Sequence, residues 1–177
     1  MCIYKGDAME ETKRKLRTIC TVGSVISALF IVALAIALVA CVIIAILAPD
    51  IIDNFTGIEV VGDVTAGEIR TLAVVLIVNL IVTGFMFILL YRMFQNMRAY
   101  SPFTDENVKT MKLLAIVLLI FGVLAPVMNM VANSIMTNIS IPEWVGMEVI
   151  VGAVIFYCLS LIFQYGTELQ KESDQTL

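Results

Sequence analysis

Three polar residues inside apolar runs are the best candidates in this sequence for a functional site. Asn129 and Asn133 are four positions apart and therefore share a face of a helix. Glu148 is the acidic residue deepest in the following apolar run. If the two runs pair antiparallel about a turn near Ile139, Asn129 and Glu148 lie at nearly equal depth. Because polar groups are costly in lipid and often functional, we predict a polar cluster of Asn129, Asn133 and Glu148. The alternative is that Glu148 only reaches the lipid headgroups.

Other chemistry is poorly represented in the sequence. It has no histidine, which excludes imidazole acid–base catalysis and histidine–metal ligation. None of the four cysteines forms a C-x-x-C pair, so neither a structural zinc site nor a disulfide is expected. No glycine-rich loop suits a phosphate. We therefore predict that the protein is not an enzyme and has no catalytic residue, metal or cofactor.

Four long apolar runs position these residues, over about 19–48, 72–91, 113–136 and 144–163. A helix needs roughly 20 apolar residues to cross a hydrocarbon core of ~30 Å. In lipid only a helix satisfies its backbone hydrogen bonds within one segment. The chain is 60% hydrophobic with a mean hydropathy of +1.00, more apolar surface than a soluble domain of 177 residues hides. We predict an all-α integral membrane protein, with residues 1–177 forming one four-transmembrane-helix bundle.

The basic residues are distributed very unevenly between the two sides of these runs. Ten of the eleven lie before the first run, between the second and third, or after the fourth, and only Arg70 lies on the other side. The positive-inside rule then predicts N-in/C-in topology, with both termini cytoplasmic in the cell (inner) membrane. The segment Lys13-Arg-Lys-Leu-Arg17 is expected to contact anionic lipid of the bilayer. The net charge of −4 gives no support for direct nucleic acid binding.

Several helix ends can be recognised locally. Thr65-Ala-Gly-Glu68 and Ser140-Ile-Pro-Glu143 fit the capping box, in which a hydroxyl and a carboxylate satisfy unpaired amides reciprocally. Thr104 suits the N-cap of the third helix. Gly62-Asp63, between β-branched residues, predicts a short β-hairpin in the outer loop.

Two segments on the cytoplasmic side carry a family resemblance. Ser101-Pro-Phe-Thr-Asp-Glu-Asn107 precedes the third run, and Phe163-Gln-Tyr-Gly-Thr-Glu-Leu-Gln-Lys-Glu-Ser-Asp-Gln-Thr-Leu177 ends the chain. Together with the four-span layout they resemble the prokaryotic "domain of unknown function 2975" membrane family, also called YoaS-like. The resemblance implies a bacterial or archaeal inner-membrane protein and brings no biochemical activity with it. Members are often encoded beside a small helix-turn-helix regulator, so the resemblance implies such a soluble partner.

These segments and the charges around them form the predicted cytoplasmic face. We expect the fourth helix to continue past the membrane, with Glu168 and Glu172 on one side of it. Our hypothesis is that this tail docks on the loop 95–110 through charge, and the alternative is a solvated, fraying helix end. The candidate residues of the face are Arg92, Arg98, Ser101, Pro102, Phe103, Glu106, Asn107, Lys109, Lys112, Glu168, Gln170 and Glu172.

The sequence indicates a function only by elimination of the enzyme classes above. We predict a non-enzymatic regulatory or scaffold protein with a cytoplasmic interaction face. The alternative is a small transporter or channel subunit working as an oligomer, although the inner halves of three runs offer no polar path. Small residues of the first run permit close helix packing, either within the chain or in a homo-oligomer. They are Gly23, Ser27, Ala33, Ala37, Cys41 and Ala45.

Overall fold

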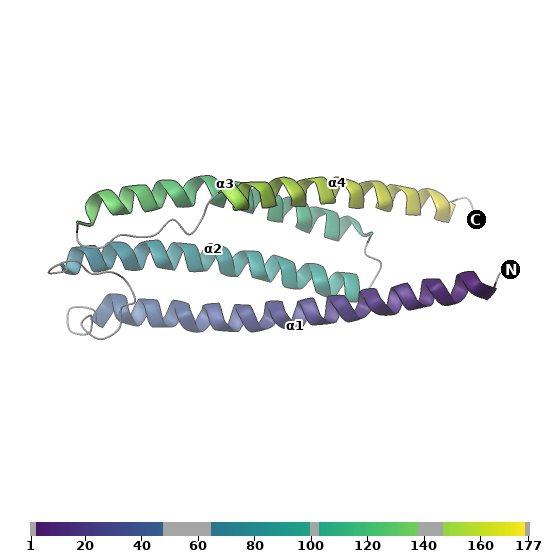
Figure 1. The fold of residues 1–177 in the computed structure, drawn as a ribbon, viewed down its shortest axis with the longest axis horizontal. Helices are drawn as coiled ribbons and strands as arrows, with labels where there is room; N and C mark the ends of the chain where they lie inside the picture. The colour runs from purple at the N-terminus through teal and green to yellow at the C-terminus, as the bar shows by residue number, and fades with distance from the viewer. Residues whose placement is uncertain (1–2, 48–64, 100–102, 138–146, 176–177) are drawn as a thin grey trace.

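The computed structural model describes residues 3–47, 65–99, 103–137 and 147–175. These residues form four helices, namely α1 (Ile3–Leu47), α2 (Ala66–Ala99), α3 (Asp105–Ile135) and α4 (Met147–Gln175) (Figure 1). The described residues are all-helical, as predicted, and each helix is long and apolar enough to cross a membrane. The predicted hairpin at Gly62-Asp63 and the capping box at Ser140–Glu143 lie outside the described residues.

The helices are longer than the apolar runs that predicted them. α1 has 45 residues and would extend about 68 Å at ~1.5 Å per residue, well beyond a ~30 Å hydrocarbon core. It begins at Ile3, sixteen residues before the apolar run, because the polar stretch before that run contains no proline to stop a helix. α4 likewise continues from the end of its apolar run at Phe163 to Gln175, as predicted. Helical segments therefore project from the apolar region.

The helices pack in chain order, α1 on α2, α2 on α3, and α3 on α4. In the part of the chain that the structure describes, no other pair of helices is in contact. The predicted four-helix bundle is therefore open, since α1 and α4 do not meet to close it. Both termini lie at the same end of the molecule (Figure 1), as an even number of spans requires.

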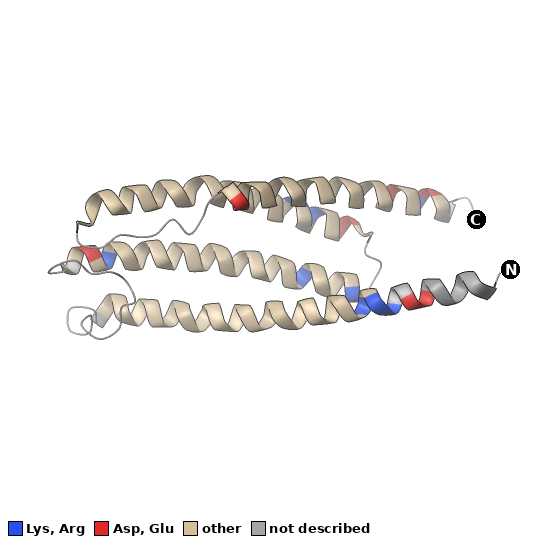
Figure 2. Cartoon of the chain, viewed as in Figure 1, with Lys and Arg blue, Asp and Glu red and all other residues tan. Residues whose placement is uncertain are grey.

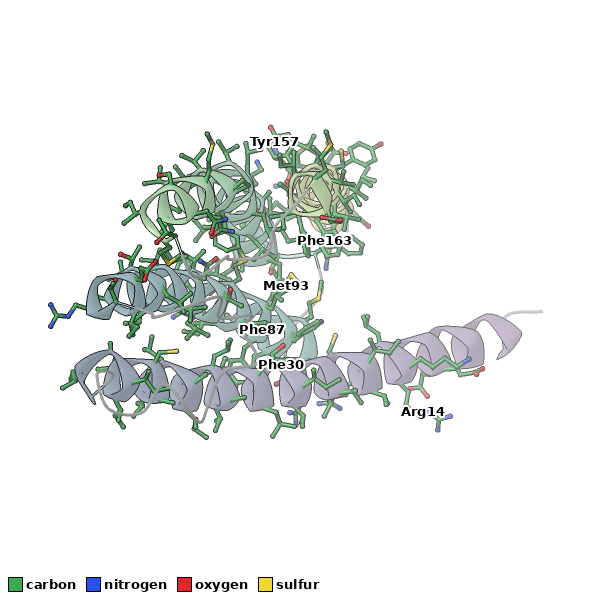
Figure 3. All side chains as sticks on the ribbon, turned by 60° about the vertical axis from the view of Figure 1, so that its left-hand side comes forward. Arg14, Phe30, Phe87, Met93, Tyr157 and Phe163 are labelled. Carbon is green, nitrogen blue, oxygen red and sulfur yellow. The ribbon has the colours of Figure 1, made fainter. Side chains whose placement is uncertain are left out.

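Small residues of α1 allow α2 to approach closely. A Cβ atom added to Gly23 would lie 2.9 Å from the ring of Phe94, so only glycine leaves room for this aromatic side chain. Ser27 is buried and donates its hydroxyl to the Gly23 carbonyl, at 2.8 Å. Further along, the rings of Phe30 and Phe87 stack with centroids 4.8 Å apart (Figure 3). Packing within the chain thus accounts for Gly23 and Ser27.

In the second hairpin, formed by α3 and α4, a glycine again allows close packing of the two helices. A Cβ on Gly122 would lie 2.9 Å from Cγ1 of Ile150 and 3.5 Å from its backbone nitrogen. The two helices therefore nearly touch at this level, which fixes their register. Between the hairpins, Val75 of α2 forms a small buried cluster with Ala132 and Met136 at the far end of α3. Elsewhere large apolar side chains are exposed along all four helices, as expected for surfaces that face lipid.

Candidate functional site

The end of the molecule that holds both termini also holds most of its described Lys and Arg residues (Figure 2). We call this the basic end. Here α1 and α3 begin and α2 and α4 finish. The candidate site is the contact between the start of α3 and the last turns of α4, residues 103–112 against 163–171, which we call the tail contact.

Thr104 starts α3 as predicted. Its backbone is extended (φ −126°, ψ 147°), and its side-chain oxygen accepts a hydrogen bond from the Asn107 amide at 3.3 Å. Asp105 and Glu106 occupy the first turn, where negative charge complements the positive end of the helix dipole. The cap fixes the direction in which Phe103, the residue before it, leaves the helix.

Phe103 packs into a notch in α4. Its ring lies 5.4 Å from that of Phe163, centroid to centroid, at an angle of 45°. A Cβ atom on Gly166 would lie 2.6 Å from Cδ1 of Phe103. Gly166 therefore makes room for an aromatic ring. The two segments that carry the family resemblance are in direct contact here.

Polar contacts flank this aromatic contact. The Lys171 ammonium pairs with the Asp105 carboxylate at 2.8 Å. Lys112 donates to the side-chain carbonyl of Gln164 at 2.8 Å, and the Gln164 amide donates to Glu168 at 3.1 Å. These contacts place the tail of α4 against the start of α3. However, the ion pair joins a tail lysine to an α3 carboxylate, the reverse of the polarity we predicted. Glu168 instead binds within its own helix.

The ion pair also affects the carboxyl group of Asp105, which lies before the apolar run of α3. The hydrogen bond from Lys171 and its positive charge hold the pKa of Asp105 below its ordinary value, with a smaller contribution from Lys109. Both side chains of the pair remain more than half exposed, at 57% and 64%. Solvent therefore screens the attraction, and the ion pair orients the tail more than it stabilises it.

Buried polar residues continue the tail contact inward. Asn107 has no exposed surface, and its backbone amide is held by Thr104. Ser160 and Thr167 of α4 are also buried and donate their hydroxyls to carbonyls of their own helix, at 2.6 and 2.8 Å. The hydroxyls therefore cost little to bury. The other predicted face residues Arg92, Arg98, Glu106, Lys109, Gln170 and Glu172 are exposed, Lys112 is half-buried, and Ser101 and Pro102 lie outside the described residues.

Two members of the predicted polar cluster, Asn129 and Glu148, do not lie at the same depth. Because Gly122 lies opposite Ile150, Asn129 is level with a position before the start of α4 at Met147. Glu148 lies in the first turn of α4 and is exposed, whereas Asn129 is only 5% exposed. The equal depth that we predicted for Asn129 and Glu148 is therefore not observed. The cause is the register of α3 and α4, set by Gly122 against Ile150, which differs from the register that a turn near Ile139 would give.

A different polar group joins α2 to the end of α3, at the end of the molecule opposite the basic end. Glu68 completes the predicted capping box, accepting from the Thr65 amide at 2.9 Å while its own amide donates to the Thr65 hydroxyl at 3.4 Å. Its other carboxylate oxygen accepts from the amide and the hydroxyl of Thr137, at 2.7 and 3.1 Å. Glu68 is only 5% exposed. We call Thr65, Glu68 and Thr137 the Glu68 latch. The capping box signalled its first half, but no local pattern predicts the contact with Thr137.

Asn79 and the cavity beside it offer little chemistry. The Asn79 amide donates to the Val75 carbonyl one turn back, at 2.8 Å, and not across to another helix. A cavity of about 170 Å³ between α2 and α3 is lined by Asn79 and eight apolar residues. Among the described residues, no three Cys, Asp or Glu side chains are grouped to hold a metal ion. These features do not add a binding site for a polar solute.

The fold and the contacts define the class: a multi-pass membrane protein of four helices whose ends are tied by polar contacts. Comparison with protein families, curated proteins and solved structures finds no match to this chain. The family resemblance of segments 101–107 and 163–177 stays a prediction.

Proposed function

We propose that this protein is a non-enzymatic regulatory or scaffold protein of a bacterial cell membrane, with both termini in the cytoplasm. The tail contact forms its interaction face. The observation that carries the proposal is Phe103 packed against Gly166 and Phe163. This packing holds two helix ends together beyond the apolar runs, and such a paired surface suits recognition by a soluble protein.

Exposed apolar side chains on the tail support a role in binding. Tyr165 and Leu169 are 64% and 47% exposed and lie four residues apart on one face of α4, after its apolar run. Aromatic and aliphatic side chains surrounded by charge are typical anchors of protein interfaces. Glu168 and Glu172, which are exposed on the same side of α4, place charge beside them. The resemblance favours a helix-turn-helix regulator as the soluble partner.

The alternative, a transporter or channel subunit, has less support. The cavity between α2 and α3 is lined by apolar side chains apart from Asn79, so it offers a hydrated ion no replacement for its water. A flux of ions through liposomes containing only this protein would favour this alternative.

Site-specific photo-crosslinking in cells tests the proposed face. A crosslinking amino acid at Leu169 should capture one soluble protein, because this side chain is exposed beyond the apolar run. The matched control is Ile155, equally exposed on the same helix but within the apolar run, which should capture only lipid or membrane protein. Loss of the Leu169 product in a Gly166→Leu variant would tie capture to the tail contact. Identical soluble products from both positions, or none from Leu169, would contradict the proposal.

A further inference from the structure

A second feature of the basic end lies away from the tail contact, between α1 and α2. Three arginines, Arg14 and Arg17 of α1 and Arg98 of α2, surround an open pocket of about 310 Å³. Thr18, Thr21 and Val22 complete its lining. The α1 residues recur at helical spacing and therefore form one face of that helix. Figure 3 places Arg14 on the part of α1 that extends past the end of α2.

No ion pair to a carboxylate is formed by these three guanidinium groups among the described side chains. Among the side chains that the structure describes, the ion pairs are Lys15 with Glu11 and Lys171 with Asp105, and neither includes one of these arginines. Glu11, a nearby carboxylate on α1, is thus already engaged. Three like charges around one pocket repel each other unless an anion is present. The electrostatics of the pocket therefore favour an anionic ligand.

The hydrogen-bonding capacity of the pocket narrows the choice of anion. The hydroxyls of Thr18 and Thr21 donate to the Arg14 and Arg17 carbonyls, at 3.0 and 2.8 Å, so their protons are used within the helix. The arginines must supply the donors. A guanidinium presents a planar fork of N–H groups that matches the oxygens of a phosphate. The pocket thus suits a phosphate group held by two or three arginines.

The apolar surface beside the pocket indicates what the phosphate is attached to. Val22 lines the pocket, and Ile19, Val25 and Ile26 around it are each about half or more exposed. Here α1 passes from its polar start into the apolar run, so the pocket lies where lipid headgroups meet acyl chains. A free phosphate would use the arginines and ignore this surface, whereas a phospholipid would use both.

From this arrangement we infer that the pocket formed by Arg14, Arg17 and Arg98 binds the phosphate headgroup of an anionic phospholipid. The lipid would bridge α1 and α2 close to two existing contacts between them. These are Phe94 against Gly23 and the hydrogen bond from Gln95 to Ser24, at 3.0 Å. Bound lipid would therefore strengthen the α1–α2 hairpin. This site is independent of the tail contact, and its failure would leave the proposed function standing.

Native mass spectrometry of the full-length protein in detergent, titrated with phosphatidylglycerol, tests the site. The variant Arg14→Gln/Arg17→Gln/Arg98→Gln should lose affinity for the first lipid by on the order of 100-fold, since each basic residue near a membrane surface contributes about fivefold. Within α2, Arg98→Gln should weaken binding, whereas Arg92→Gln should not, because Arg92 lies outside the pocket. Equal affinity in the triple variant and the unmodified protein would overturn the inference.

A second triple variant, Arg→Lys at the same positions, tests whether the site recognises phosphate through the guanidinium groups or only through positive charge. Because the charges that direct membrane insertion are kept, the variant should insert normally. It keeps every positive charge but loses the planar fork, so binding should weaken by about fivefold or more. Binding as tight as in the unmodified protein would show attraction by charge without a built site, and would overturn the inference. Inorganic phosphate at millimolar concentration should not displace the lipid. If it does, the ligand is a soluble anion and the lipid assignment is wrong.

Discussion

The two ends of this molecule hold their helices together by different physics. The Glu68 latch joins α2 to α3 through a carboxylate that is only 5% exposed and accepts hydrogen bonds on both oxygens. The tail contact joins α3 to α4 through an aromatic ring in a glycine notch and an ion pair whose side chains are mostly exposed. Buried charge-assisted bonds are costly to break, whereas exposed pairs are screened by water and salt. The Glu68 latch should therefore be harder to separate than the tail contact.

The largest effect is expected at the latch. Glu68→Ala removes the acceptor of the Thr65 and Thr137 amides, and with it the side-chain cap of α2 and the tie to Thr137. We expect the free energy of unfolding in detergent to fall by about 2–4 kcal/mol. Glu148→Ala is the control, because this exposed residue also lies in the first turn of its helix, and it should change stability by less than about 0.5 kcal/mol. An equal loss of unfolding free energy in the two variants would show that the Glu68 latch contributes no special stability, which would contradict the comparison.

A smaller effect is expected at the notch. Gly166→Ala would place a Cβ atom 2.6 Å from Cδ1 of Phe103, and the ring must move away. We expect a loss of about 1–2 kcal/mol in unfolding free energy. Gly152→Ala, on the same helix, meets no atom within 4 Å and should be neutral or stabilising by up to ~1 kcal/mol. If the two alanine variants unfold alike, Phe103 does not occupy the notch.

The smallest effect concerns the ion pair. A carboxyl whose folded pKa is lowered stabilises the folded contact above its unfolded pKa, about 3.9, and loses that contribution as pH falls through the lowered value. A spin label at Gln175 should therefore be restrained at neutral pH and become more mobile in acid below about pH 4, or in high salt. Lys171→Gln should be mobile at every pH, and Lys171→Arg should behave like the unmodified protein. If the mobility of the label does not change with pH or salt, the ion pair does not restrain the tail, and the packing of Phe103 alone holds it.

Local patterns in the sequence predicted some of these features and missed others. The apolar runs, the Thr104 cap and the Thr65–Glu68 box follow from residues a few positions apart, so they were predicted correctly. The bond from Thr137 to Glu68 joins residues 69 positions apart and leaves no local trace. The role of Gly166 could not be predicted from the sequence for the same reason. The notch is defined by Phe103, which comes from a distant part of the chain.

The error at Glu148 has a related cause. Its predicted depth depended on where the chain turns between α3 and α4. The packing of Ile150 against Gly122 sets that register, and a contact between two helices cannot be deduced from the length of the apolar runs.

The central claim, that the start of α3 and the tail of α4 form one cytoplasmic face, is tested most directly by cysteine crosslinking. Asp105→Cys/Lys171→Cys, in a variant whose four native cysteines are alanine, is treated with a short, membrane-impermeant reagent that carries two thiol-reactive maleimide groups, in inverted and in right-side-out vesicles. In a control pair, Asp105→Cys/Tyr157→Cys, the second thiol lies fourteen residues, or about 21 Å, closer to the start of α4 than position 171. We predict crosslinking of the first pair only, and only in inverted vesicles. Crosslinking in right-side-out vesicles alone, or none in either for a correctly inserted protein, would contradict the account.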